Sequence, residues 1–439
     1  MESTSGAPAF AKGFERIRVL WPDHLGLARG KYVPATMAAR GARHCTGTWA
    51  LGFDRQMTPG TPGSFFFEGL PDMDARFSPG TVRPGWEGPG TGVVVADLER
   101  EGQPVAVSPR GALRRAIADW EALGYRPEVG IELEAYLMEP DGAGGWQPIA
   151  TPGAFVYGTG PSVDPHGIVG ELWDAADRAG IAIEAINSEY DESQFEFTLA
   201  HTDALEAADR TFLFKQMARE LATRHGLLWT FLGKPVNDRG GSGLHVNVSF
   251  TAPDGGNAVD DPSDPDGLSP LARRAAAGLL AHHQGLCGLV APTVTAYRRL
   301  RPGQLAGYWA NWGHDHRGAT VRIPPERGAA ARLEHRLADG AAPAHVAVAA
   351  VLQAARLGVV DELELGPPET GDGFEHVDAT VGCPTNLGAA LDALEADGAL
   401  CDAVGKELVQ QHLAVKRTEW DAFCAYTTDW EKRAYLPFL

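Results

Sequence analysis

Residues 189–196 read Glu-Tyr-Asp-Glu-Ser-Gln-Phe-Glu and follow an apolar run, residues 181–186, that is typical of a buried strand. The segment places several acidic side chains close together. Crowded carboxylates repel one another, and a fold retains them most readily when a cation lies between them. Oxygen ligands favour Mg²⁺ or Mn²⁺. A solvated acidic turn is the alternative interpretation, and the segment alone does not decide between the two.

A second predicted strand, residues 128–138, carries two carboxylates on one face. Glu132 and Glu134 are two positions apart, so their side chains point to the same side of a strand. Two carboxylates on an otherwise largely apolar strand are costly unless they are paired or bind a metal ion. An exposed strand face is the alternative.

A third polar strand face follows a cluster of glycines in residues 240–249, which read Gly-Gly-Ser-Gly-Leu-His-Val-Asn-Val-Ser. Glycine lets a ligand approach the backbone closely. His245, Asn247 and Ser249 then alternate with apolar residues and share one strand face. His245 is a candidate metal ligand, and a buried structural histidine is the other interpretation. The segment lacks the Gly-Lys-Ser/Thr ending of a phosphate-binding loop.

Arginines are concentrated in two later segments. Residues 297–302 read Tyr-Arg-Arg-Leu-Arg-Pro, and residues 317–336 hold Glu334 together with Arg317, Arg322, Arg332 and Arg336. Guanidinium groups directed at one place bind phosphate or carboxylate through paired hydrogen bonds, whereas a solvated surface is the alternative. The acids, the histidine and the arginines together predict a divalent-metal site that faces a polyphosphate and an anionic second substrate. That combination is typical of phosphoryl transfer.

The overall composition limits the possible partners. The net charge is −19, from 38 basic and 57 acidic side chains, which argues against binding to nucleic acid or to anionic lipid. The chain contains no apolar run long enough to span a membrane. Its five cysteines are scattered and form no Cys-x-x-Cys pair, which predicts neither a disulfide framework nor a zinc–thiolate site and suits a reducing cytoplasm.

The pattern of elements predicts two domains in an α+β protein. Residues 14–107 are expected to form a small sheet-rich domain, with a hairpin at 14–36, strands at 47–54 and 93–97, and an irregular loop at 57–92. Residues 108–439 alternate between helices and strands. The expected helices are 109–123, 167–179, 203–225, 269–289, 341–357, 386–396 and 402–423. The expected strands are 128–138, 181–186, 194–199, 228–232, 243–250, 318–323 and 331–337.

Six motifs in order resemble those of the glutamine synthetase family, over nearly the whole chain. They are Gly130-Ile-Glu-Leu-Glu134, Glu189 to Glu196, Lys234-Pro235 with Gly241-Ser-Gly-Leu-His245, Pro292 to Gly303, Arg317 to Pro324, and Arg332 to Arg336. The resemblance implies a small N-terminal β-grasp domain and a larger catalytic domain with a curved antiparallel sheet. It also implies a homo-oligomeric double ring (a dodecamer) with active sites shared between subunits. ATP and glutamate would be substrates, with Mg²⁺ or Mn²⁺ bound.

The resemblance also implies roles for individual residues. One metal ion would be held by Glu134, Glu189 and Glu196, and the second by Glu132, His245 and Glu334. Nucleotide contacts would come from Arg322, Arg332, Asn247 and Ser249. Glutamate and the transferred phosphate would be oriented by Arg299, Arg317, Arg336 and the backbone of Gly241. An amine would then displace phosphate from a γ-glutamyl phosphate.

The departures from the family pattern concern the amine and acid sites. The family carries a glutamate that holds and deprotonates ammonium where this chain has Leu305. Asp54 is the candidate for the family's acid in the N-terminal domain, and Gly240 replaces an expected asparagine near glutamate. These changes predict a glutamate–amine ligase for an amine with an apolar part, with Tyr308, Trp309 and Trp312 near Leu305. The alternatives are a true glutamine synthetase, a catalytically silent ring protein, and an acid substrate other than glutamate.

Overall fold

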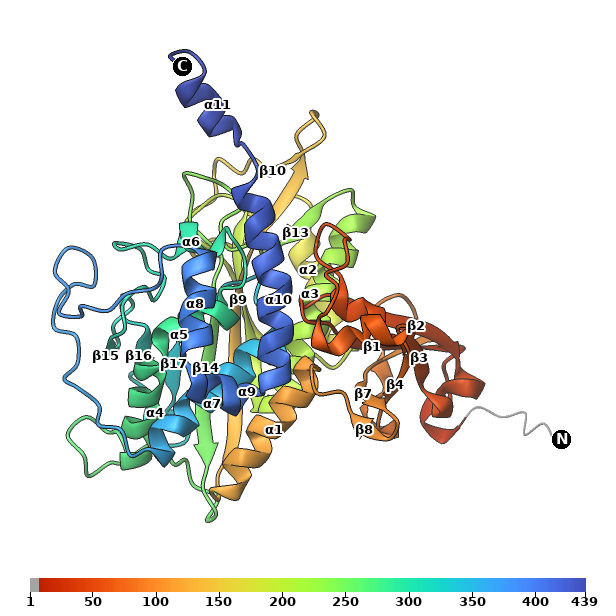
Figure 1. The fold of residues 1–439 in the computed structure, drawn as a ribbon, viewed down its shortest axis with the longest axis horizontal. Helices are drawn as coiled ribbons and strands as arrows, with labels where there is room; N and C mark the ends of the chain where they lie inside the picture. Colours follow the sequence, from red (N-terminus) through yellow and green to blue (C-terminus); the bar gives the residue numbers. More distant parts are fainter. Residues whose placement is uncertain (1–7) are drawn as a thin grey trace.

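The computed structural model describes residues 8–439 (Figure 1). Residues 16–104 contribute the strands of two small sheets at one side of the molecule. One sheet has the order β2 (Ala28–Pro34), β1 (Arg16–Pro22), β6 (Thr91–Val95), β5 (Arg83–Pro84). The other has the order β3 (Ala42–Cys45), β4 (Asp72–Arg76), β7 (Asp97–Arg100), β8 (Gln103–Pro104). The predicted hairpin at 14–36 is present, because β1 and β2 pair antiparallel from Arg16 to Pro34.

A large, mainly antiparallel sheet organises the rest of the chain. Its order is β11 (Ile183–Ser188), β12 (Gln194–Asp203), β9 (Arg126–Pro140), β14 (Leu244–Thr251), β17 (Leu333–His335), β16 (Val321–Ile323), β15 (Trp312–His314). Two short strands, β10 (Trp146–Pro148) and β13 (Leu228–Thr230), also pair with β9. Only β15 and β16 run parallel among these pairs within residues 8–439.

Helices, most of which cover one face of this sheet, make up much of the remaining chain. They are α1 (Pro109–Ala122), α2 (Ile168–Arg178), α3 (Ala204–Arg224), α4 (Pro270–Ala281), α5 (His283–Val290), α6 (Ala296–Arg299), α7 (Ala344–Val360), α8 (Leu387–Ala396), α9 (Gly398–Val404), α10 (Lys406–Cys424) and α11 (Asp429–Tyr435). Helix α1 begins where the sequence predicts, with the Ser108 hydroxyl accepting a hydrogen bond from the Gly111 amide. Figure 1 shows α11 projecting away from the body of the molecule.

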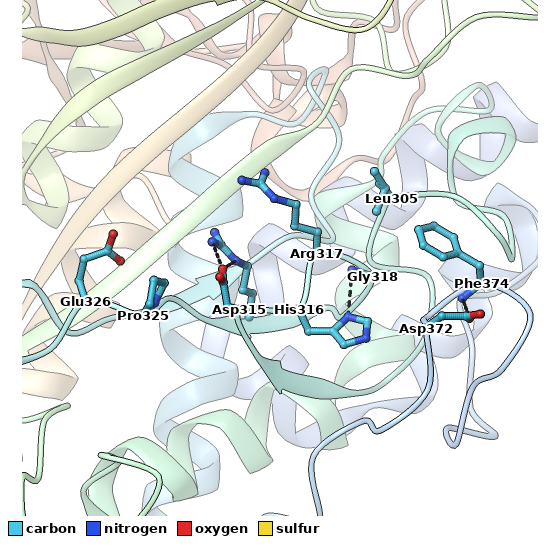
Figure 2. Close-up of a pocket in the computed structure, with 10 residues that line it drawn as sticks. Leu305, Asp315, His316, Arg317, Gly318, Pro325, Glu326, Asp372 and Phe374 are labelled. Carbon is cyan, nitrogen blue, oxygen red and sulfur yellow. Dashed lines mark hydrogen bonds and ion pairs between the residues drawn. The ribbon is translucent and has the colours of Figure 1, made fainter. Parts of the chain in front are cut away.

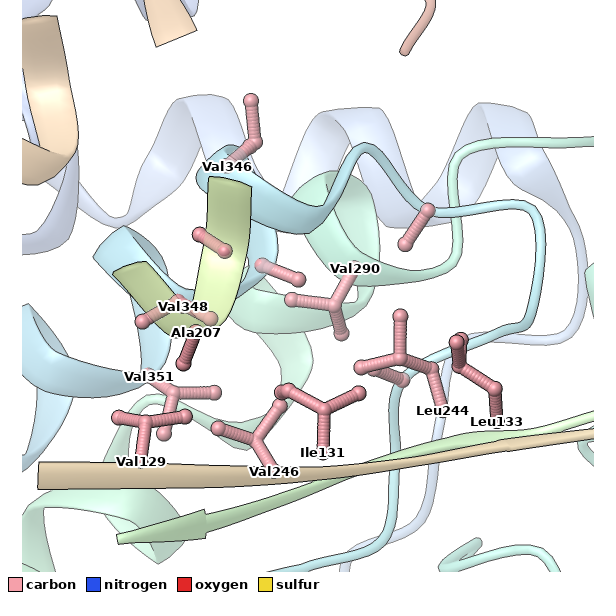
Figure 3. Close-up of a cluster of buried hydrophobic side chains, with 14 of the residues drawn as sticks. Val129, Ile131, Leu133, Ala207, Leu244, Val246, Val290, Val346, Val348 and Val351 are labelled. Atoms are coloured by element: carbon pink, nitrogen blue, oxygen red, sulfur yellow. The ribbon is translucent and has the colours of Figure 1, made fainter. Parts of the chain in front are cut away.

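The hydrophobic core fills the space between the large sheet and its helices. Alternate residues of β9 and β14 point into it and meet side chains of α3, α5 and α7 (Figure 3). The labelled members are Val129, Ile131, Leu133, Ala207, Leu244, Val246, Val290, Val346, Val348 and Val351. Because successive side chains of a strand point to opposite faces, the residues between these apolar ones face the other side of the sheet.

Several predicted elements differ from the structure. Residues 47–54 are not a strand, because Thr46–Ala50 forms a 3-10 helix whose Trp49 is buried between the small sheets. The predicted loop at 57–92 contains strand β4. The predicted helix 402–423 is divided at Gly405, whose φ of 122° is a conformation that favours glycine. The predicted helix 269–289 is divided at His282 into α4 and α5.

Among residues 8–439, no helix is long and apolar enough to cross a membrane.

Candidate active site

The open face of the large sheet gathers the polar residues of four strands. The register places Glu132 of β9 opposite His245 of β14, and Glu134 of β9 opposite Glu196 of β12. On β17, Glu334 pairs with Asn247. The period-two alternation that points valine and isoleucine into the core therefore also brings these acids and the histidine together.

One cluster consists of Glu132, His245 and Glu334, whose ligand atoms lie within 4.8 Å of one another. The Nδ1 atom of His245 is 3.0 Å from a carboxylate oxygen of Glu132 and 3.7 Å from one of Glu334. Glu334 is fully buried. The resemblance described above implies that these three residues hold one metal ion, and the fold brings them together.

A second cluster shares the same histidine. Glu134, Glu196 and His245 also place ligand atoms within 4.8 Å of one another, and the Gly243 amide donates a 2.9 Å hydrogen bond to Glu134. The Nε2 atom of His245 is buried and has no hydrogen-bond partner among residues 8–439. Glu189 lies close enough to Glu134 to be affected by its charge.

The pKa values of these carboxyl groups record the crowding. Burial, followed by the neighbouring charge of Glu132, raises the pKa of Glu196 to about 7. Burial and then the charge of Glu134 raise the pKa of Glu189 above its ordinary range. Burial opposes the ionisation of Glu132, but the hydrogen bond and charge of His245, the hydrogen bond from Asn247 and the charge of Arg336 together outweigh it and lower that pKa to about 2. Without a cation the face is electrostatically unfavourable, and its set of five carboxylates and one imidazole suits Mg²⁺ or Mn²⁺.

Arginines surround the buried Glu334. Its carboxylate accepts hydrogen bonds from Arg336 and, at 2.6 Å, from Arg322. Arg322 also pairs with Asp315, a residue that the sequence analysis did not single out. Two cations on one buried acid hold it ionised and fix the direction of the guanidinium planes.

A cavity of about 260 Å³ adjoins the Glu132 cluster. Asn247, Ser249 and Arg332 line it, and these are three of the four residues that we expect to contact the nucleotide. Asn247 connects the cavity to the carboxylates, because its amide donates a 3.1 Å hydrogen bond to Glu132 and its carbonyl oxygen accepts a 3.1 Å hydrogen bond from Arg332. His201 lines the same cavity, and its exposed strand position gave no signal in the sequence.

The glycine segment lies directly over Arg299. A Cβ atom at Gly241 would come within 2.7 Å of the Arg299 side chain and 2.6 Å of the Gly233 carbonyl oxygen, so glycine is required there. The Arg299 guanidinium is buried and donates to the Leu337 carbonyl oxygen at 3.1 Å. Arg299 therefore supports the glycine segment.

Asp191 explains the absence of a side chain at position 240. Its carboxylate accepts hydrogen bonds from the Gly240 amide and from the Tyr136 hydroxyl. A Cβ atom at Gly240 would lie 2.9 Å from the same carboxylate. Glu192 pairs with Arg239 at 3.2 Å. Asp191 and Glu192 of the 189–196 segment thus hold the 239–241 loop.

A separate cavity of about 430 Å³ lies beside Leu305 and Arg317 (Figure 2). Figure 2 shows Leu305 and Phe374 on one side, with Arg317 between Leu305 and Asp315. Phe374 belongs to the long segment between α7 and α8, and its position in a loop gave no indication of this role.

The three residues expected near Leu305, namely Tyr308, Trp309 and Trp312, do not line this cavity. Trp312 is a core residue whose indole donates to the Gly366 carbonyl oxygen, and Trp309 pairs with Gly382. The aromatic wall that we expected at 308–312 is therefore supplied by Phe374.

Asp54 lies apart from the clusters within one chain. Its carboxylate accepts a 2.9 Å hydrogen bond from the Gln56 amide. The neighbouring Phe53 ring lies 4.9 Å from the ammonium group of Lys416 on α10. The loop is thus fixed against α10.

Comparison with known proteins gives a consistent result. Residues 106–435 match the family described as glutamine synthetase, catalytic domain. The chain is 30% identical over 447 residues to a protein named glutamine synthetase from Pyrococcus horikoshii, a match that covers 97% of this chain and 96% of the relative. The solved structure titled "GmaS/ADP complex-Conformation 1" is similar with a TM-score of 0.86 at 30% identity, covering 98% of this chain and 100% of that one. A structure titled "Crystal structure of novel glutamine synthase homolog" gives a TM-score of 0.81 at 28% identity, covering 96% and 98%. The predicted α+β fold is confirmed by these similarities.

Proposed function

The chain belongs to the glutamine synthetase family of ATP-dependent ligases, and we propose that it joins the γ-carboxylate of glutamate to a small amine other than ammonium. The observation that carries the proposal is the contrast between two parts of the site. All six candidate metal ligands are present on the sheet or at its edge, whereas Leu305 stands where the family uses an acid for ammonium. A leucine can neither attract ammonium nor take its proton, but it can contact the carbon part of an amine.

The family uses ATP and Mg²⁺ or Mn²⁺. In this chain we assign one ion to Glu134, Glu189 and Glu196 and the other to Glu132, His245 and Glu334. Divalent ions there neutralise the phosphate charge that develops during transfer. The unpartnered His245 Nε2 and the raised pKa values of Glu189 and Glu196 support the assignment. A cation bound among these groups would be a partner for the imidazole nitrogen and would reduce the repulsion between the carboxylates.

We assign the nucleotide to the cavity beside the Glu132 cluster. Asn247 and Ser249 line its wall, and Arg332 lines it together with the preceding residues 329–331. Arg322 donates a hydrogen bond to Glu334 and also lines the cavity beside Leu305. We assign its guanidinium group to contacts with phosphate oxygens. The resemblance to a structure titled as an ADP complex supports this assignment.

The acid substrate is assigned to the space between the glycine segment and the arginines. The Gly241 carbonyl oxygen accepts a hydrogen bond from Gln194, which fixes the backbone that we assign to glutamate binding. Arg336 and Arg317 then face the γ-carboxylate and the transferred phosphate. The γ-carboxylate oxygen attacks the γ-phosphorus of ATP, the bond to the bridging oxygen breaks, and ADP leaves.

The amine completes the reaction. Its nitrogen lone pair attacks the carbonyl carbon of γ-glutamyl phosphate, the C–N bond forms, and the bond to phosphate breaks. One proton leaves the nitrogen, and we assign its acceptor to Glu189 or to Asp54 of a neighbouring chain. Leu305 and Phe374 contact the amine's carbon part, where a family member that uses ammonium has an acid.

A ring assembly accounts for Asp54. Within one chain this residue is exposed and distant from the two clusters, on a loop fixed by Lys416. We propose that it reaches the site of an adjacent subunit in a double ring. Exposed apolar residues of the C-terminal segment, including Leu436 and Phe438, support burial in an assembly. The free state of all five cysteines supports a reducing cytoplasm.

The proposal is tested by phosphate release from ATP with glutamate and a panel of amines. We expect release to require both glutamate and an amine, with a primary alkylamine giving a higher kcat/KM than ammonium. The curated relatives are named glutamine synthetase, and equal or better use of ammonium would favour that activity for this chain as well. Absence of ATP turnover with every pair would favour a silent ring protein.

A further inference from the structure

A buried thiol and imidazole cluster lies behind the active-site sheet, away from the metal and substrate groups described above. Its members are His283 and Cys287 on α5 and Cys383 in the segment before α8. Exposures of 1%, 0% and 4% place all three in the core. Their candidate ligand atoms lie within 4.8 Å of one another.

We propose that His283, Cys287 and Cys383 form a zinc site that fastens the acceptor loop to α5. The distances are close to those that a tetrahedral ion requires. Zinc–sulfur and zinc–nitrogen bonds of about 2.3 Å and 2.1 Å imply about 3.6 Å between neighbouring sulfur and nitrogen ligands. The Cys383 sulfur lies 3.4 Å from Nε2 of His283.

A fourth ligand is available from the backbone. The Tyr308 carbonyl oxygen lies 3.0 Å from the same imidazole nitrogen. Tyr308 also accepts a hydrogen bond from the Cys383 amide at 2.9 Å. The set of two sulfurs, one nitrogen and one oxygen therefore converges beside the later part of the loop that holds Leu305, and an ion there would tie three segments together.

Charge favours a divalent ion in this place. Two thiolates and one divalent cation sum to zero, so the site can be buried without a further counter-ion. A monovalent copper ion would leave one negative charge in the core, which is costly. Magnesium prefers oxygen ligands and would not select thiolates.

The His283 imidazole directs its Nε2 atom at the other candidate ligands. That nitrogen lies 3.4 Å from the Cys383 sulfur and 3.0 Å from the Tyr308 carbonyl oxygen, whereas Nδ1 has no hydrogen-bond partner within the described residues, 8–439. The tautomer with its proton on Nδ1 leaves the Nε2 lone pair free to bind a metal ion.

The competing explanation is a group of protonated thiols bonded to the backbone. Cys287 lies 3.3 Å from the His283 carbonyl oxygen, and Cys383 lies 3.8 Å from that of Gly307. Such thiols would bind no metal. Cobalt distinguishes the two cases, because Co²⁺ bound to thiolate absorbs in the near ultraviolet, whereas Co²⁺ at the carboxylate clusters of the active site does not.

The experiment is a Co²⁺ titration of the full-length chain after removal of metals by a chelator, under reducing conditions and with excess Mg²⁺. We expect a thiolate-to-cobalt band that saturates at one equivalent per chain and disappears when Zn²⁺ is added. Cys287→Ser and Cys383→Ser should lose the band, and Cys401→Ser, at a half-buried cysteine outside the cluster, should retain it.

Two results would overturn the zinc site. One is a reduced wild-type chain without the band, which decides the matter even when a serine variant fails to fold. The other is a band that persists in both Cys287→Ser and Cys383→Ser. Because the readout is spectroscopic, neither result depends on the ligase reaction.

Discussion

Replacement of Glu196 by glutamine should stabilise the metal-free protein while it removes function. The carboxyl group is surrounded by Glu132, Glu134 and Glu189, and its pKa is raised from an ordinary value of 4.5 to about 7. The difference of about 2.5 pH units corresponds to about 3 kcal/mol between the ionised and neutral forms in the folded chain. Glutamine has nearly the same shape and carries no charge.

The sign of the effect follows from linkage. Below pH 4.5 the group is protonated in both folded and unfolded chains and contributes nothing. As the pH rises from 4.5 to 7, the unfolded chain ionises first, so the free energy of unfolding falls. Above pH 7 the full cost of about 3 kcal/mol is present in the wild type and absent in Glu196→Gln.

The assay is thermal or urea unfolding of chelator-treated protein at pH 5 and pH 8. We expect Glu196→Gln to exceed the wild type by up to about 3 kcal/mol at pH 8 and to differ little at pH 5. Addition of Mg²⁺ or Mn²⁺ should stabilise the wild type and change the variant much less. Glu139→Gln, at the far end of β9, is the matched control and should show neither effect. A wild type as stable as Glu196→Gln at pH 8 without metal would refute the reasoning.

Further predictions concern the acceptor, the assembly and the core. Leu305→Glu should lower kcat/KM for an alkylamine by about tenfold or more, because about 1–3 kcal/mol of apolar contact is lost, and should raise the relative use of ammonium. An unchanged amine preference in steady-state kinetics would contradict the assignment of Leu305 to the acceptor site. Asp54→Ala and Glu134→Ala should each abolish turnover. If sites are shared between subunits, a mixture of the two variants should regain part of the activity after subunit exchange. A mixture that stays inactive despite exchange would contradict the shared site. Arg110→Ala should cost about 3–5 kcal/mol in urea unfolding, because Asp209 then loses a buried partner at 2.8 Å; a loss below about 1 kcal/mol would contradict this.

The sequence predicted which acidic and histidine side chains share one face of the sheet, because strand alternation is a local property. Glu132 and Glu134 share a face wherever β9 lies, and the same holds for His245 and Asn247. Antiparallel pairing in the large sheet then brings those faces together. The order of the six motifs along the chain indicated the family and therefore the candidate ligands. The fold places five of the six candidate ligands in the two clusters, with Glu189 beside them.

Residues carried by loops could not be predicted in the same way. Phe374 reaches the cavity beside Leu305 only because the segment between α7 and α8 folds back over the sheet edge. Asp191 gave the same acidic signal as its neighbours, yet hydrogen bonds to Gly240 and Tyr136 turn it toward a structural role. Cys383 and His283 are 100 residues apart and share no local pattern.

The most direct test of the central claim is a competition experiment. The protein is supplied with ATP, Mg²⁺, glutamate and equal concentrations of ammonium and a primary alkylamine, and the products are identified by mass. We predict the γ-glutamyl alkylamide as the main product, with ADP and phosphate formed in equal amounts. Glutamine as the main product would contradict the assignment of Leu305 to an amine pocket.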